Sequence, residues 1–106
     1  MQYLYTIELV ERLHHLRNWT SDDEIAVNKH FEYLKIQMEL GNVILAGRTQ
    51  NDLKDTFGIV IFNALNDDEA QSFMEDDPSI QTGVMIGTLY PYAIALSKFE
   101  NIKNER

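Results

Sequence analysis

Two side chains in this sequence have types and positions that could support acid/base chemistry. His30 lies three residues after Val27 and four before Leu34, so it shares the helical side that should face a sheet. Imidazole titrates near neutral pH and can act as a general base or acid. Asp77 precedes Pro78 and could orient such a ring and stabilise its charged form. The plainer alternatives are a hydrogen-bonded histidine at the border of an apolar stripe and an ordinary Asp-Pro turn.

Three further residues could bind a substrate. Arg48 could hold a carboxylate, enolate or phosphate through two parallel hydrogen bonds, although composition alone favours a surface arginine at the start of a polar loop. Arg17 and Trp19 lie in an irregular stretch that could close over a pocket. Trp19 alone equally suits a core or interface anchor. Asp76 could replace Asp77 if the register is shifted by one residue.

Other kinds of chemistry find less support. The chain has no cysteine, which excludes disulfides, thiol catalysis and thiolate metal sites. His14, His15 and His30 could offer three nitrogens to zinc, but no spacing signature supports that site. No nucleophile elbow, P-loop or dinucleotide-binding glycine pattern is present. We therefore predict neither a metal nor a cofactor.

The candidate residues must be positioned by alternating strands and helices. Apolar runs and helix-start signals predict strands over 3–10, 43–47, 58–64 and 83–99, and helices over 21–40 and 67–77. Residues 11–19 have no clean period and predict a loop with a short helical turn. Pro91 suggests a bulge or an edge position in the last strand.

Helix boundaries follow from capping residues. Ser21 should cap the first helix, with Glu24 three residues later completing a capping box. Gly41 and Asn42 can adopt the left-handed conformation that ends it. Its apolar stripe should comprise Val27, Phe31, Leu34 and Met38. The second helix should begin at an Asn66 cap with Glu69 three residues on, and end at Pro78.

The element order predicts an α+β fold of the ferredoxin-like, split βαβ type. Its antiparallel sheet carries helices on one face only. Because the strands are apolar almost throughout, the other face should pack against a second copy, giving a homodimer with two sheets face to face. The end-strand tyrosines would be mostly core or dimer contacts, with one hydroxyl free to enter a cleft; they are Tyr3, Tyr5, Tyr90 and Tyr92.

Composition narrows the partners. The chain has 106 residues, with 9 basic and 17 acidic side chains and a formal net charge of −8, which disfavours nucleic acid and anionic membrane surfaces. No apolar stretch reaches membrane-spanning length and no secretory signal precedes the first strand, so a soluble, cytoplasmic protein is expected. One domain should cover residues 1–98, followed by a frayed tail over 99–106.

Several motifs together resemble the YciI-like (YCII-related) family. They are "KHFEYLKIQMELGNVILAG", then "DDEAQSFMEDDPSIQTGV", with "LHHLRNWTSDDEIAVNKH" ahead of them. The resemblance covers about residues 3–97 and rests on the order and spacing of the motifs. It implies a dimeric α+β barrel, similar to muconolactone isomerases. It also implies a His–Asp acid/base pair in a cleft, which falls on His30 and Asp77. One described member type is a dehydrochlorinase acting on a chlorinated aromatic diol. Arg48 departs from the pattern, since many relatives have proline there.

These observations give two functional hypotheses. The leading one is a small cofactor-free lyase or isomerase that moves a proton on a small anionic or phenolic metabolite through His30 and Asp77. The alternative is a non-catalytic module of the same dimeric fold that binds a small molecule. If His30 is sealed in the core or lies far from Asp77, the enzyme hypothesis loses its basis.

Overall fold

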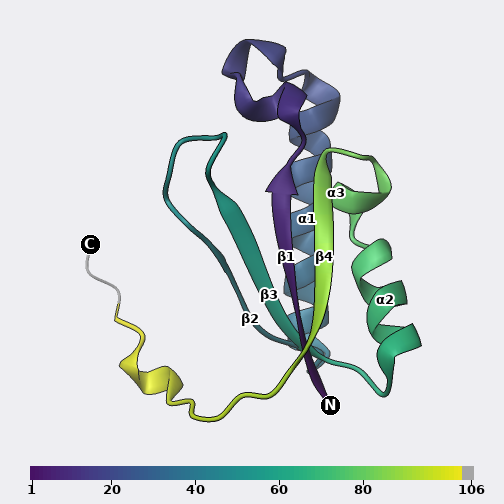
Figure 1. Cartoon of the computed structure of the whole chain (residues 1–106), viewed down its shortest axis with the longest axis vertical. Coiled ribbons are helices and arrows are strands. Elements are labelled where there is room, and N and C mark those ends of the chain that lie inside the picture. The colour runs from purple at the N-terminus through teal and green to yellow at the C-terminus, as the bar shows by residue number, and fades with distance from the viewer. Residues whose placement is uncertain (104–106) are drawn as a thin grey trace.

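A computed structural model describes residues 1–103 and shows one four-stranded antiparallel sheet with helices on one face (Figure 1). The sheet order is β2-β3-β1-β4, as predicted for a ferredoxin-like fold. The elements are β1 (Gln2–Leu9), α1 (Ser21–Glu39), β2 (Val43–Arg48), β3 (Phe57–Asn63), α2 (Asp67–Glu75), α3 (Pro78–Gln81) and β4 (Met85–Tyr92). The predicted irregular stretch after β1 contains two short 3-10 helices, Glu11–His14 and Leu16–Asn18. None of the helices in the described part of the chain is long and apolar enough to cross a membrane.

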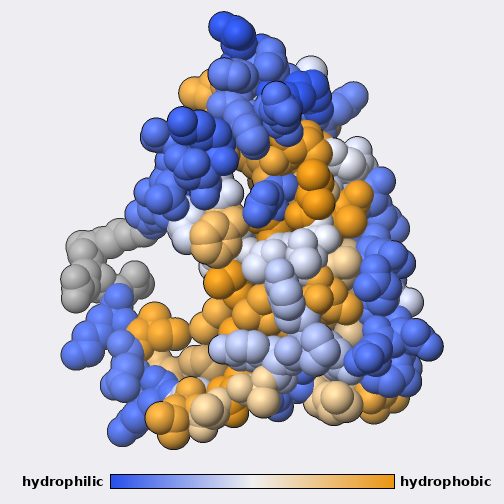
Figure 2. Space-filling view, viewed as in Figure 1, coloured by the Kyte–Doolittle hydropathy of each residue, from blue (hydrophilic) through white to orange (hydrophobic). Residues whose placement is uncertain are grey.

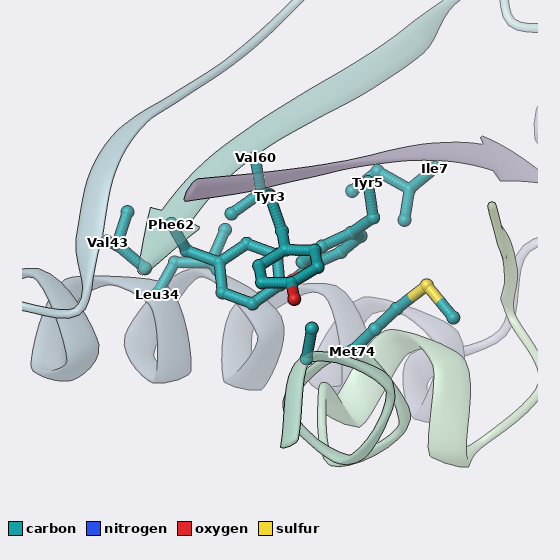
Figure 3. Close-up of a cluster of buried hydrophobic side chains, with 9 residues drawn as sticks. Tyr3, Tyr5, Ile7, Leu34, Val43, Val60, Phe62 and Met74 are labelled. Atoms are coloured by element: carbon teal, nitrogen blue, oxygen red, sulfur yellow. The ribbon is translucent and has the colours of Figure 1, made fainter. Parts of the chain in front are cut away.

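The core lies between the inner face of the sheet and the helices. Alternate residues of β1 and β3 point inward, and the buried cluster in Figure 3 includes Tyr3, Tyr5 and Phe62, each at most 1% exposed. Phe62 stacks on Phe73 of α2 with ring centroids 4.4 Å apart, and Tyr5 meets Phe62 edge-on. Aromatic packing of this kind adds to the free energy gained by burial. The inner face therefore fixes β1 and α2 relative to each other.

The cap of α1 lies one residue earlier than predicted. Thr20, not Ser21, is the N-cap, and Asp23, not Glu24, completes the capping box. Asp23 binds Arg12 through both oxygens at 2.8 Å, and it also accepts the Thr20 backbone N–H. These hydrogen bonds, led by those from Arg12, hold the pKa of the Asp23 carboxyl well below its usual range. The arginine, which lies outside the helix, explains why the box forms on Asp23.

The predicted apolar stripe of α1 is only partly buried. Leu34 is in the core, but Phe31 is 67% exposed and Met38 is 46% exposed, so the prediction was wrong for these two. Phe31 borders the cavity described below rather than packed core. At the end of the helix, Gly41 takes the left-handed conformation at φ 89°, and Asn42 does not.

The region after α2 contains a helix that the sequence did not predict. The Asn66 cap is confirmed, since its side chain accepts a hydrogen bond from the Glu69 N–H. However, α2 ends at Glu75, and Pro78 begins the short helix α3 instead of merely stopping α2. Proline suits this first position because its missing N–H would have no helical partner there. Asp77 thereby becomes the N-cap of α3.

The last predicted strand is shorter than expected. β4 ends at Tyr92, and Pro91 lies on this edge strand as predicted. Within residues 93–103, the only regular element is a 3-10 helix, Phe99–Asn101. The tail predicted over 99–106 extends beyond the described part of the chain, since residues 104–106 lie outside it.

Candidate active site

Asp77 is a completely buried carboxylate at the N-terminus of α3. Its Oδ1 accepts the Ser79 backbone N–H at 3.0 Å and the Ser79 hydroxyl at 2.8 Å, and both residues are 0% exposed. The Tyr5 hydroxyl, from β1, donates to Oδ2 at 2.7 Å. His30, from α1, places its Nδ1 2.8 Å from both carboxylate oxygens. Three separate parts of the chain therefore meet on one carboxyl group.

These hydrogen bonds keep Asp77 ionised. Burial raises the pKa of the carboxyl, but hydrogen bonding and attraction to His30, with the bonds from Tyr5 and the Ser79 N–H, outweigh it, so the pKa is lowered. Burial and the charge of Asp77 raise the pKa of the Tyr5 phenol far above its ordinary value, so Tyr5 remains a donor. Asp77 is therefore an acceptor only.

The ionised state of Asp77 fixes the tautomer of His30. A carboxylate cannot donate, so the short contact requires that Nδ1 carry the proton. In the neutral ring the lone pair then lies on Nε2, which has no hydrogen-bond partner among residues 1–103. An imidazole held in this way is ready to accept a proton at Nε2 and to be stabilised by Asp77 once charged.

Ser79 does not complete a nucleophilic triad. Its Oγ lies 3.3 Å from the same His30 nitrogen that faces Asp77, and its own hydrogen bonds Asp77 at 2.8 Å. A nucleophilic serine would need the other ring nitrogen as its base and access to substrate. Because Ser79 is fully buried, its role is to hold the carboxylate.

His30 faces a cavity of about 790 Å³ between α1 and the β2–β3 half of the sheet. The side chain is 13% exposed, so the ring is sheltered but not sealed in the core. The walls are mainly apolar and aromatic, with Trp19, Phe31 and Leu34 among them. Such a volume suits a small organic molecule, and the dry walls would strengthen charge interactions inside.

Arg48 lines the same cavity because of a bulge in β2. Val43 faces the core opposite Phe62, but the register shifts at Ile44, and Arg48 then pairs with Gly58 on the inner face. A one-residue shift moves the following side chains to the opposite face of a sheet. Without the bulge, strict alternation from Val43 would turn Arg48 outward. Arg48 is thus an exposed residue, as the surface interpretation expected, but it ends β2 and borders the cavity.

Of the other predicted site residues, one lines the cavity and the others lie outside it. Trp19 lines the cavity and donates its Nε1–H to the Leu13 carbonyl at 3.0 Å, whereas Arg17 is exposed and lies outside the lining. Asp76 is an exposed C-cap of α2 and does not replace Asp77. Glu24, which we had considered only as a cap, also lines the cavity.

The other two histidines do not join His30. His14 places its Nε2 3.1 Å from the Leu9 carbonyl, and His15 is exposed. Within residues 1–103, no group of three or more histidine, aspartate or glutamate side chains is arranged to hold a metal ion.

Tyr5 and Ser79 were missed as site residues. The alternation of β1 placed Tyr5 in the core, but its hydroxyl partner is 72 residues away and depends on the tertiary fold. The "DDPS" sequence did carry a signal for Ser79, because aspartate followed by proline at a helix start is a cap signature.

Replacing Tyr5 with phenylalanine should lower the free energy of unfolding by about 2 kcal/mol, because a buried carboxylate loses one charge-assisted hydrogen bond. Tyr3→Phe is a matched control, since Tyr3 is equally buried but its hydroxyl donates to Asp67, which is exposed. That variant should lose less than about 1 kcal/mol. Urea denaturation measures both. Equal losses in the two variants would show that the Tyr5–Asp77 hydrogen bond stabilises the fold no more than the Tyr3–Asp67 hydrogen bond.

Comparisons with known proteins agree with this fold. A comparison with curated proteins finds no match. The structure is similar to 5-chloro-2-hydroxyhydroquinone dehydrochlorinase from Burkholderia phenoliruptrix AC1100, solved in complex with 2,5-dihydroxybenzoquinone, with a TM-score of 0.63. The two are 22% identical, over 88% of this chain and 94% of that chain, which supports a shared fold and nothing finer. A model of the YCII-related domain family matches residues 1–90. This match spans most of the chain, and the protein belongs to the YCII-related domain family.

Proposed function

We propose that this protein is a cofactor-free acid/base enzyme of the lyase or isomerase type. The observation that carries the proposal is the short contact between His30 and a fully buried, ionised Asp77, with the histidine ring at the wall of a cavity. Nε2 would take a proton from the substrate, and Asp77 would stabilise the resulting imidazolium. Tyr5 and Ser79 would position Asp77 and would not touch the substrate.

The cavity favours a small planar molecule with an anionic or phenolic group. Aromatic walls at Trp19 and Phe31 suit a ring, and Arg48 offers a cation that forms no ion pair with residues 1–103. The similar dehydrochlorinase binds a dihydroxybenzoquinone, and we extend this class of ligand to the present chain as part of the proposal. Elimination from a chlorinated hydroxyhydroquinone would release a proton and a chloride ion and leave a hydroxyquinone, so it needs a base and no external oxidant.

The uncovered face of the sheet supports a homodimer. The outward residues of β4, Ile86 and Tyr90, are 60% and 48% exposed, and Phe57 of β3 is 38% exposed. Figure 2, which views the molecule from the side where the strands lie in front of α1, shows apolar surface over this region. Two copies packed through this face would bury it.

Binding of 2,5-dihydroxybenzoquinone tests the site. Nuclear magnetic resonance should show saturable shifts at the His30 ring and at the indole of Trp19, the only tryptophan, with His14 and His15 unchanged. Shifts confined to His14 and His15, or none up to millimolar ligand, would contradict the proposed site.

Arg48→Ala should weaken binding of this ligand about 10- to 100-fold, because the acidic hydroxyls ionise and lose a bidentate cationic partner. Neutral hydroquinone should bind both proteins with similar affinity. Arg17→Ala is the matched control, since Arg17 is exposed and outside the cavity. Calorimetric titration measures all of these affinities. An Arg48→Ala protein that binds the anion normally would remove Arg48 from the site.

A further inference from the structure

The chain continues beyond the sheet as an arm, residues 93–103, that lies apart from the rest of the molecule. It leaves the end of β4 and projects past the β2 side of the sheet (Figure 1). The Ile94 N–H donates to Gln2 Oε1 at 3.2 Å and fixes where the arm begins. The other hydrogen bonds within the described arm are internal: the Asn101 N–H donates to the Lys98 carbonyl, and the Ile102 N–H donates to the Phe99 carbonyl.

This arm exposes large apolar side chains at regular spacing. Leu96 is 94% exposed, Phe99 is 49% exposed and Ile102 is 70% exposed. In Figure 2 the arm carries apolar surface, and open space separates much of it from the body. Single exposed apolar residues are ordinary on protein surfaces. Three large ones within eleven residues, in a segment that packs little against its own domain, indicate a surface that binds a partner.

The charge of the arm differs from that of the body. Lys98 and Lys103 lie in the arm with Glu100 as its only acidic residue, whereas fifteen of the seventeen acidic residues of the whole sequence precede residue 98. A segment with more basic than acidic residues is attracted to a partner of net negative charge, and a second copy of this chain, with a formal net charge of −8, is such a partner.

The arm is also continuous with the uncovered face of the sheet. Alternate residues of β4 point to that face and end at Tyr92, which is 44% exposed and directly precedes the arm. Figure 1 shows the arm extending away from its own sheet. A partner packed on this face would therefore meet the sheet and the arm as one continuous apolar surface.

We propose that residues 93–103 form an exchanged arm that packs on the partner subunit of the homodimer. By two-fold symmetry each copy would give one arm and receive one, so six large apolar side chains would be buried together. The proposal rests on the dimer of the proposed function. The arm lies outside residues 1–90, which the family model matches.

Removing the apolar side chains tests the arm. In the triple variant Leu96→Ser, Phe99→Ser and Ile102→Ser, the dissociation constant of the dimer should rise at least about 100-fold by sedimentation velocity. A chain ending after Ile94 should behave in the same way. The control, Leu40→Ser with Leu65→Ser, changes two apolar residues that are 67% and 77% exposed on the body and should leave dimerisation unchanged.

A second measurement identifies which copy holds the arm. In dimers of one isotope-labelled and one unlabelled chain, methyl groups of Leu96 and Ile102 should show nuclear Overhauser contacts to the unlabelled chain. Contacts only within the labelled chain would overturn the exchange. So would a dimer of unchanged affinity in both arm variants, or a native protein that is monomeric at tens of micromolar.

Failure of the arm can be distinguished from failure of the site. The protein ending after Ile94 retains His30, Asp77 and the cavity, so it should still show the His30 shift with 2,5-dihydroxybenzoquinone. A retained shift with unchanged dimerisation would overturn the arm and leave the acid/base site standing.

Discussion

His30→Gln should lower kcat of the proposed elimination by roughly 100- to 10,000-fold, with little change in KM, when 5-chloro-2-hydroxyhydroquinone is used as the trial substrate. Glutamine keeps a polar side chain at the cavity wall but has no nitrogen that can accept a proton at neutral pH. The proton that Nε2 would take in the transition state then has no positioned acceptor. Initial rates of chloride release, measured over a range of substrate concentrations, give the two parameters separately.

His15→Gln is the matched control for this experiment. His15 is exposed and lies outside the cavity, so its replacement should leave kcat unchanged. An unchanged rate in His30→Gln would remove the acid/base role. Tight binding of the quinone by the native protein without chloride release would favour the non-catalytic binding module over an enzyme acting on this substrate.

Asp77→Asn should have the largest effect on stability, lowering the free energy of unfolding by about 3 kcal/mol. Asp77 accepts all four of its hydrogen bonds through its two carboxylate oxygens. An asparagine amide has only one acceptor oxygen, and its NH₂ group would face hydrogen-bond donors and repel them. For a domain of this size the loss corresponds to a fall in Tm of roughly 10–20 °C. Differential scanning calorimetry measures it. Asp76→Asn is the control, since the Asp76 carboxylate is exposed and its replacement should change the free energy of unfolding little.

The stability difference between native protein and Asp77→Asn should also depend on pH. The pKa of Asp77 is lowered by folding, so its ionised form stabilises the native state above the unfolded pKa of about 3.9. That contribution is lost as the pH falls through the lower folded value. Urea denaturation at several pH values should therefore show the difference narrowing below about pH 4. A difference that widens in acid would contradict the lowered pKa.

Sequence patterns predicted the two residues at the centre of the site, because each lies at a position that local rules define. His30 falls at helical spacing between apolar neighbours, and Asp77 precedes a proline, as the structure also places them. Their contact spans 47 residues, and what implied it was the resemblance to the YCII-related family rather than either local pattern.

The parts that were missed depend on contacts that no local pattern contains. The cap of α1 shifted to Thr20 because Arg12, in a separate 3-10 helix, binds Asp23. Phe31 remains exposed because a cavity opens below it, and helical periodicity cannot distinguish a cavity wall from packed core. The orientation of Arg48 depends on a bulge, which changes the register without any glycine or proline to mark it.

That bulge in β2 means that the register of the strand, as well as its residues, determines which side chains line the cavity. If the strand paired without the bulge at unchanged length, simple alternation from Val43 would present Leu45 and Gly47 to the ligand, with Arg48 turned to the opposite face. The cavity would lose its arginine with no substitution in its wall. Divergence within this fold could therefore switch ligand preference through a change of register, a route that comparing aligned residues one by one would overlook.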